Sequence, residues 1–280
     1  MSLHTLASTT ELAAHLADPD WVIIDCRHDL ADPLAGRAEY RRSHIPGARY
    51  LDAAEDLAAP LSGKNGRHPL PTVEAFSQSL ARAGIETGRQ VIAYDAQAGV
   101  FAARLWWMLR WIGHDAVAVL DGGWNKWIAE GRPVSAEIPA PSQASFAPSP
   151  RSTAVDCSFV LASLDKPGVV LLDARAPDRF RGENETLDPV GGRIPGAANR
   201  FFKENLGSGG LFKPAAQLRQ EYSALLAGRN PEQLVHYCGS GVSACHNVLA
   251  MEIAGLANGR LYAGSWSEWC ADPSRPRAQG

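Results

Sequence analysis

Short apolar runs alternate along the chain with longer segments whose apolar residues recur at helical spacing. Runs of this length, apolar at nearly every position, are typical of strands buried on both faces of a parallel sheet. Helical spacing over 101–114 and 243–255 predicts helices that end at Gly113 and Gly255. The pattern therefore predicts an α/β fold, with mainly parallel sheets that carry helices on both faces. The predicted strands are residues 22–25, 91–94, 117–120, 169–172, 234–237 and 259–262.

The two halves of the chain repeat the same motifs in the same order. Chance recurrence of common short sequences does not produce four matches in one order, so the pattern indicates a duplicated domain. The matched pairs are "VIIDCR" and "VVLLDAR", "HIPGA" and "RIPGA", "VIAYD" and "LVHYC", and "DGGWNKW" and "AGSWSEW".

The stretch between the copies differs in composition from both. It is rich in Pro, Ser and Ala and has no periodicity, which is typical of a linker. We therefore predict a first domain over residues 1–135, a linker over 136–155 and a second domain over 156–280. A chain of 280 residues suits two domains of ordinary size.

Charge and composition narrow the possible functions. The formal net charge is −3 and no Lys/Arg-rich run occurs, so the sequence does not favour nucleic-acid binding. The N-terminal residues predict no signal peptide, and no apolar run is long enough to predict a membrane span. Five cysteines at irregular spacing do not form a disulfide framework. These features predict a cytoplasmic protein in a reducing compartment.

Cys238 stands where chemistry is expected in such a fold. It follows the predicted strand 234–237 and precedes the predicted helix 243–255, and ligands of open parallel sheets bind at the carboxyl ends of strands. The intervening residues Gly239, Ser240, Gly241 and Val242 let several main-chain N–H groups point inward as an anion nest. A helix N-terminus adds positive potential, and such surroundings favour a nucleophilic thiolate.

Three other roles for Cys238 fit the sequence less well. A buried structural thiol would be expected in both halves if folding required it, but the first half carries Asp95 at this position. A metal site built from His236, Cys238, Cys245 and His246 has spacing wider than a zinc knuckle, so no metal is predicted. A cysteine phosphatase requires Cys-x5-Arg, but the sixth residue after Cys238 is Ala244. We therefore infer one active domain and one non-catalytic partner domain.

Taken together, these motifs resemble the two-domain rhodanese-type sulfurtransferases over nearly the whole chain. The resemblance rests on two Asp-x-Arg strand ends, two Ile-Pro-Gly-Ala turns, the loop "CGSGVSA" and the closing "GSWSEW". It implies a persulfide at Cys238, a small sulfur donor and an acceptor such as a thiol, cyanide or reduced thioredoxin. It implies no cofactor. A persulfide carrier without efficient turnover of small donors stays open as an alternative.

The loop after Cys238 resembles the 3-mercaptopyruvate subfamily, with Ser243 in place of a threonine. Its lack of basic residues suits a singly charged donor better than thiosulfate, which stays the runner-up. The resemblance implies that Arg179, in "DRFRG", binds the donor together with the loop residues Gly239, Gly241, Val242 and Ser243. The second arginine that the subfamily carries soon after is absent, which leaves the donor open, with Arg193 and Arg200 as candidate substitutes.

The same subfamily implies a serine–histidine–aspartate group around the donor. Ser240 matches the serine, His44 of "HIPGA" matches the histidine, and Asp32 is the candidate aspartate. Such a group would polarise the donor carbonyl or protonate the departing enolate. Features found in both halves are expected to be structural instead. They include the Asp-x-Arg pairs and the tryptophans of the closing motifs. Cys245 is expected to pack inside its helix, with a resolving role in oxidation left open.

Overall fold

The chain divides into two compact units in the computed structural model, which describes residues 2–140, 144–164, 166 and 168–280. Unit 1 comprises Met1–Ala59 and Pro71–Arg151, and unit 2 comprises Pro60–Leu70 and Ser152–Gly280. The division after Arg151 falls inside the predicted linker 136–155, of which residues 141–143 lie outside the described part. The segment 60–70 belongs to unit 2, although the sequence placed it within the first domain.

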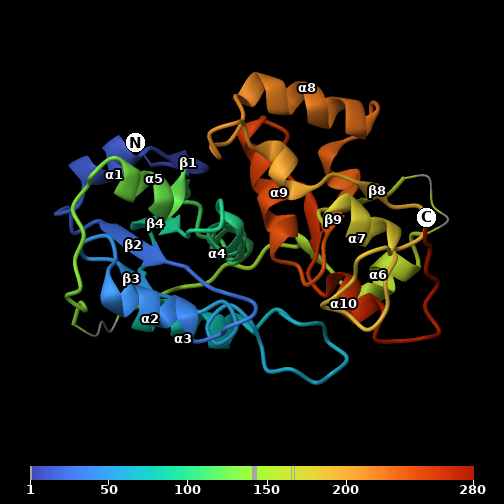
Figure 1. The fold of residues 1–280 in the computed structure, drawn as a ribbon, viewed down its shortest axis with the longest axis horizontal. Coiled ribbons are helices and arrows are strands. Elements are labelled where there is room, and N and C mark those ends of the chain that lie inside the picture. Colours follow the sequence, from blue (N-terminus) through green and yellow to red (C-terminus); the bar gives the residue numbers. More distant parts are fainter. Residues whose placement is uncertain (1, 141–143, 165, 167) are drawn as a thin grey trace. The chain divides into compact units, whose positions relative to one another are not determined.

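Unit 1 contains a parallel sheet with helices around it (Figure 1). Its strand order is β1-β5-β4-β2-β3, and all pairings between these strands are parallel. The strands are β1 (Leu6–Ala7), β2 (Trp21–Asp25), β3 (Arg49–Tyr50), β4 (Gln90–Tyr94) and β5 (Val117–Leu120). The helices are α1 (Thr9–Ala14), α2 (Ala35–Arg42), α3 (Val73–Arg82), α4 (Val100–Trp111) and α5 (Gly123–Ala129).

Unit 2 repeats this arrangement, with strand order β6-β10-β9-β7-β8 and parallel pairing between these strands. The strands are β6 (Ala154–Val155), β7 (Val170–Asp173), β8 (Ala198–Asn199), β9 (Leu234–Tyr237) and β10 (Arg260–Tyr262). The helices are α6 (Cys157–Leu161), α7 (Pro177–Arg181), α8 (Ala215–Leu226), α9 (Ser243–Ile253), α10 (Ser265–Trp269), and the 3₁₀ turns η1 (Phe202–Asn205) and η2 (Pro231–Gln233).

The predicted α/β class is confirmed, and the burial pattern explains why the strands are apolar throughout. All residues of β4, β5 and β9 are buried, as expected for central strands with helices on both faces. In unit 2, Val235 packs in a cluster with Trp266 of α10, while Leu234 packs in another with Tyr222 of α8. Neighbouring residues of one strand point to opposite faces, so each face requires its own apolar layer. No helix in the described part of the chain has the length and apolar content needed to cross a membrane.

The two Asp-x-Arg motifs make the same contacts in their own units. Arg27 Nη2 lies 2.6 Å from Asp25 Oδ2, and Arg175 Nη2 lies 2.7 Å from Asp173 Oδ2. Each arginine also donates, at 2.6 Å, to the main-chain carbonyl two residues before the isoleucine of its Ile-Pro-Gly-Ala turn, that of Ser43 or Gly192. Each buried pair therefore braces the turn beside its sheet, which agrees with a structural role.

Candidate active site

Cys238 is the first residue after β9, and its sulfur is held by the turn that leads into α9. The amide N–H of Gly241 donates to Cys238 Sγ at 3.1 Å, and the side chain is buried. The amide of Cys238 donates to Ser265 Oγ at 3.0 Å, and its carbonyl accepts from the amide of Trp266 at 3.0 Å. The thiol is thus fixed at the carboxyl end of the strand, at the mouth of an N–H-rich turn.

Glycine is required at the two positions of this turn for different physical reasons. Gly241 has a φ of 78°, and a Cβ there would lie 2.3 Å from the carbonyl oxygen of Ala263. Both the backbone conformation and the close approach therefore require glycine. At Gly239 the obstacle is a pair of side chains, since a Cβ would lie 2.8 Å from Arg67 Nη2 and 3.4 Å from Arg179 Nη2. Two guanidinium groups therefore converge on the turn that begins at Cys238.

The segment 60–70 supplies Arg67, and it is anchored to α10 and to the N-cap residue of that helix, Gly264. The amide of Arg67 donates to Ser267 Oγ at 3.0 Å. Gly66 has a φ of 83°, and a Cβ there would lie 2.8 Å from the carbonyl oxygen of Gly264. These contacts place His68, the residue after Arg67, against the Cys238 turn. His68 Nδ1 lies 2.9 Å from Ser240 Oγ, and both side chains are buried.

Two buried carboxylates hold the arginines. Glu185 accepts from Arg179 Nη2 at 2.7 and 2.9 Å through its two oxygens, and from Arg175 Nη1 at 3.3 Å. Asp188 Oδ1 accepts from Arg67 Nη1, while Asp188 Oδ2 lies 3.6 Å from Arg179 Nη2. The site thus contains a four-residue network of paired charges, formed by Arg67, Arg179, Glu185 and Asp188.

The surroundings move the pKa of the two carboxyls in opposite directions. Burial raises the pKa of Asp188, against the opposing effect of Arg67. Burial also acts to raise the pKa of Glu185, but the hydrogen bonds from Arg179 and from the amides of Leu187 and Asp188 outweigh it and lower the pKa. Glu185 is therefore the more firmly ionised partner, consistent with its larger number of donors.

The predicted residues of the Cys238 turn lie together. Ser240 contacts His68, Val242 precedes α9 as its N-cap residue, and Ser243 is the first residue of that helix. Arg179 lies in α7 and reaches Gly239, as described above. Cys245 lies inside α9, where its thiol donates to the carbonyl of Gly241 at 3.2 Å.

The prediction for His44 requires correction. His44 is buried in unit 1, with Nδ1 2.7 Å from the carbonyl oxygen of Tyr40 and Nε2 3.0 Å from that of Glu137. Both ring nitrogens are therefore engaged with main-chain carbonyls. The histidine that contacts Ser240 is His68. Asp32 is also in unit 1, on an exposed turn where its Oδ1 accepts from the amide of Leu34 at 3.1 Å.

The candidate substitutes for the second arginine are also engaged elsewhere. Arg193 Nη1 donates to the carbonyl of Gly280 at 2.5 Å, and Arg200 pairs with Glu221. Arg67 is the residue that joins Arg179 at Gly239. Sequence reasoning missed Arg67 and His68 because the segment 60–70 has no helix or strand pattern. The adjacent basic pair in a Pro- and Gly-bounded stretch was the available signal.

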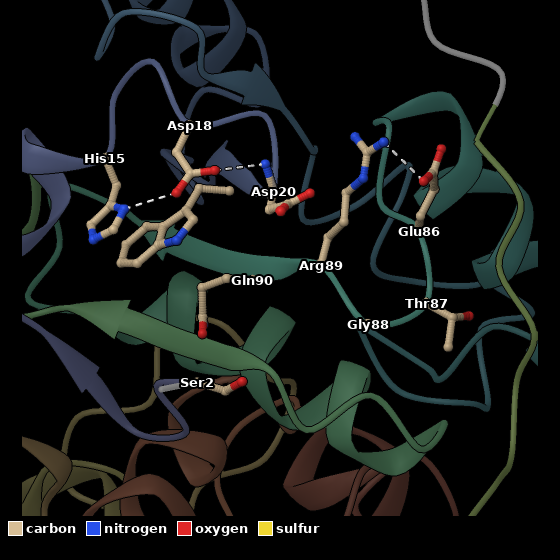
Figure 2. Close-up of a pocket in the computed structure, with 10 residues that line it drawn as sticks. Ser2, His15, Asp18, Asp20, Glu86, Thr87, Gly88, Arg89 and Gln90 are labelled. Atoms are coloured by element: carbon tan, nitrogen blue, oxygen red, sulfur yellow. Dashed lines mark hydrogen bonds and ion pairs between the residues drawn. The ribbon is translucent and has the colours of Figure 1, made fainter.

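Two other features of the described residues do not form the site. The four-residue metal pattern is not assembled, since no group of three or more potential ligands is found in the described part of the chain. Unit 1 contains a polar pocket of about 760 Å³, where His15 stacks on Trp21 and His15 Nδ1 lies 2.9 Å from Asp18 Oδ2. Figure 2 shows residues that line this pocket. No cysteine is among the residues that line it, so it does not supply a comparable nucleophile.

Comparison with known proteins agrees with this geometry. Residues 8–130 and 158–272 each match the rhodanese-like domain family. The chain belongs to the rhodanese family. It is 48% identical over 283 residues to a probable 3-mercaptopyruvate sulfurtransferase from Pseudomonas aeruginosa, with 100% of each chain covered. It is 35% identical over 241 residues to the thiosulfate sulfurtransferase of Bos taurus, covering 83% of this chain and 79% of that one.

A solved structure extends the likeness to the fold of the whole chain. The 3-mercaptopyruvate sulfurtransferase from Leishmania major superposes with a TM-score of 0.84 at 28% identity, covering 95% of this chain and 74% of that chain. The repeated motifs predicted a duplicated domain, and the family model matches the chain twice, once in each half.

Proposed function

We propose that this chain is a sulfurtransferase that moves sulfur from 3-mercaptopyruvate to an acceptor through a persulfide on Cys238. The observation that carries the proposal is the convergence of Arg67 and Arg179 on Gly239, directly after the cysteine. A thiol nucleophile beside two cations suits a donor with sulfur at one end and a carboxylate at the other. The name of the Pseudomonas aeruginosa relative supports the same donor.

In the first half-reaction, the Cys238 sulfur attacks the sulfur of the donor. A sulfur–sulfur bond forms, the donor's carbon–sulfur bond breaks, and its electron pair passes to the carbon as the enolate of pyruvate. The Ser240–His68 pair supplies the proton that this carbon requires, relayed through the hydroxyl. The balance is a thiol and 3-mercaptopyruvate giving a persulfide and pyruvate.

In the second half-reaction, an acceptor nucleophile attacks the outer sulfur, and the Cys238 thiolate leaves. Cyanide would give thiocyanate, and a thiol would give its own persulfide, from which a second thiol displaces hydrogen sulfide as a disulfide forms. Reduced thioredoxin fits the second description. The amides of Gly239, Gly241, Val242 and Ser243 line the turn that would face the charged outer sulfur. Unit 1 is the non-catalytic domain in this proposal, and a cytoplasmic location suits a thiol that must stay reduced.

The test is paired steady-state kinetics with 3-mercaptopyruvate and thiosulfate as donors and cyanide as acceptor. Wild type is expected to give a higher kcat/KM with 3-mercaptopyruvate, and mass spectrometry without acceptor is expected to find one added sulfur on Cys238. Cys238→Ser should lose activity by more than about 1,000-fold, because an alcohol cannot carry the persulfide. Cys245→Ser is the matched control, since that buried thiol lies inside α9 and is expected to retain activity.

Each result has a distinct meaning. Preference for thiosulfate would overturn the donor assignment and keep the persulfide route. Sulfur loaded on Cys238 without turnover of either donor would favour a persulfide carrier. Activity in Cys238→Ser would remove the mechanism altogether.

A further inference from the structure

Two buried acidic residues stand against the arginines that the proposed function assigns to the donor carboxylate. Glu185 and Asp188 have side chains only 3% and 2% exposed, and they pair with Arg179 and Arg67. Burying a carboxylate is costly unless a cation compensates for it, so each is tied to its arginine. What they contribute to the reaction is not explained by holding the arginines alone, because they also cancel the positive charge that attracts an anion.

The charges around Gly239 balance. Arg67 and Arg179 bring two positive charges, and Glu185 and Asp188 bring two negative charges. The nearby Arg175 is already paired with Asp173, with Nη2 2.7 Å from Oδ2. The turn itself, from Cys238 to Val242, contains no ionisable residue besides the cysteine. A donor that enters therefore meets oriented guanidinium N–H groups in a site with little excess positive charge.

We propose that Glu185 and Asp188 are specificity-determining residues that favour a singly charged carboxylate donor over the thiosulfate dianion. This inference rests on the proposed function, because it assigns the donor to the same arginines. A planar carboxylate gains most from correctly aimed N–H donors, which the acidic residues keep in place. A dianion depends more on net charge, since its interaction with each added charge is twice that of a monoanion at equal distance.

The two acidic residues act on the arginines in different ways. Glu185 bonds Arg179 through both oxygens, bonds Arg175, and accepts from the amide of Leu187 at 3.0 Å. It is mainly a positioning residue. Asp188 bonds Arg67 through one oxygen, while its other oxygen has no hydrogen-bond partner in the described part of the chain. Its second oxygen thus contributes negative charge beside Arg179 without fixing that side chain.

Asp188→Asn separates the effect of the carboxylate's negative charge from the effect of its hydrogen bond to Arg67. The amide keeps one oxygen for Arg67 and removes the negative charge from the site. We expect the ratio of kcat/KM for thiosulfate to kcat/KM for 3-mercaptopyruvate to rise about tenfold, equivalent to about 1.4 kcal/mol. The matched control is Glu183→Gln, which makes the same charge change on the same segment. Glu183 is exposed and pairs with Arg181 at 2.7 Å, so its ratio should stay within about twofold of wild type.

A second measurement keeps the inference independent of turnover. Cys238→Ser cannot form a persulfide, so calorimetry on it gives the Kd of each donor directly. Adding Asp188→Asn should shift the ratio of the two Kd values toward thiosulfate by the same factor. Glu185→Gln should shift it in the same direction, and it should also weaken binding of 3-mercaptopyruvate because Arg179 loses its alignment. Glu185→Gln therefore tests the inference if Asp188→Asn does not fold.

The outcomes separate the two proposals. If wild type turns over neither donor, the proposed function fails, while the Kd ratios still test the acidic pair. If the donor ratio stays unchanged in both Asp188→Asn and Glu185→Gln, the two residues only brace the arginines and the inference is wrong, whatever the wild-type preference.

Discussion

The same strand–turn–helix connection holds an aspartate in unit 1 and a cysteine in unit 2. Asp95 follows β4, and its carboxylate accepts four main-chain N–H bonds from the turn and the start of α4. The donors are Gln97 at 2.8 Å, Gly99 at 2.8 Å, Phe101 at 2.8 Å and Ala102 at 2.9 Å. Cys238 Sγ accepts one such bond, from Gly241 at 3.1 Å. In unit 1 the acceptor for the N–H groups of the turn is therefore the side chain of Asp95, which belongs to the protein itself.

This difference separates what the fold provides from what catalysis requires. A main-chain N–H that donates to the side chain at the strand end is found in both units, so it does not by itself make an enzyme. Unit 2 adds the thiol of Cys238, the Ser240–His68 contact and the two arginines at Gly239. In unit 1 the side chain of Asp95 fills the equivalent position and accepts more main-chain hydrogen bonds from its turn. The comparison predicts that one turn serves chemistry and the other serves stability.

The largest expected effect separates the two histidines. His68→Ala should lower kcat with 3-mercaptopyruvate by about 100-fold, because it removes the group that relays a proton through Ser240. His44→Ala should leave kcat of the folded protein within about threefold and lower the thermal midpoint, because the buried carbonyl of Tyr40 loses its partner. Steady-state kinetics and thermal unfolding of both variants check this. A greater loss of kcat in His44→Ala than in His68→Ala would restore the original assignment.

The next effect concerns stability. Asp95→Ala leaves four buried N–H groups without an acceptor, and we expect a loss of about 3 kcal/mol in the free energy of unfolding. Cys238→Ala removes one weak acceptor and should cost about 1 kcal/mol or less. Urea unfolding followed by tryptophan fluorescence compares the two. Asp95→Asn, which retains one acceptor oxygen, should fall between wild type and Asp95→Ala. Equal losses for the two alanine variants would show that the turns are not functionally divided.

The sequence predicted the features that follow from local pattern and repetition. Apolar runs located the central strands, and the strand–glycine–helix order around Cys238 located the turn between β9 and α9. The duplication identified which features are structural, as the paired contacts of Asp25 with Arg27 and of Asp173 with Arg175 bear out.

Prediction failed where tertiary contacts decide position. The segment 60–70 joins unit 2 through contacts such as that of the Arg67 amide with Ser267, residues 200 positions apart. No periodicity records such a contact, so the motif alone led to His44, and His68 was not among the candidates. The acidic partners of the arginines were missed for the same reason, because Glu185 and Asp188 lie in an irregular stretch whose charges look like a solvated surface.

The smallest expected effect tests one more difference between the matching strands. His236 of β9 corresponds to Ala93 of β4, and its ring is fully buried, with Nε2 3.1 Å from Met251 Sδ. Burial lowers the pKa of His236 from 6.5 to about 3. Between these values the unfolded chain binds a proton that the folded chain excludes. The stability present above pH 6.5 is therefore lost as the pH falls toward 3.

His236→Leu removes this titration. Between pH 6.5 and 5, the free energy of unfolding of wild type should fall by about 1–2 kcal/mol more than that of His236→Leu. Urea unfolding at intervals of half a pH unit measures the two slopes, and His15→Asn in unit 1 is the control for loss of a more exposed histidine. Parallel curves for wild type and His236→Leu would contradict a neutral buried imidazole. A slope confined to the His236-containing protein would show that acid destabilises unit 2 through one buried residue, which unit 1 replaces with alanine.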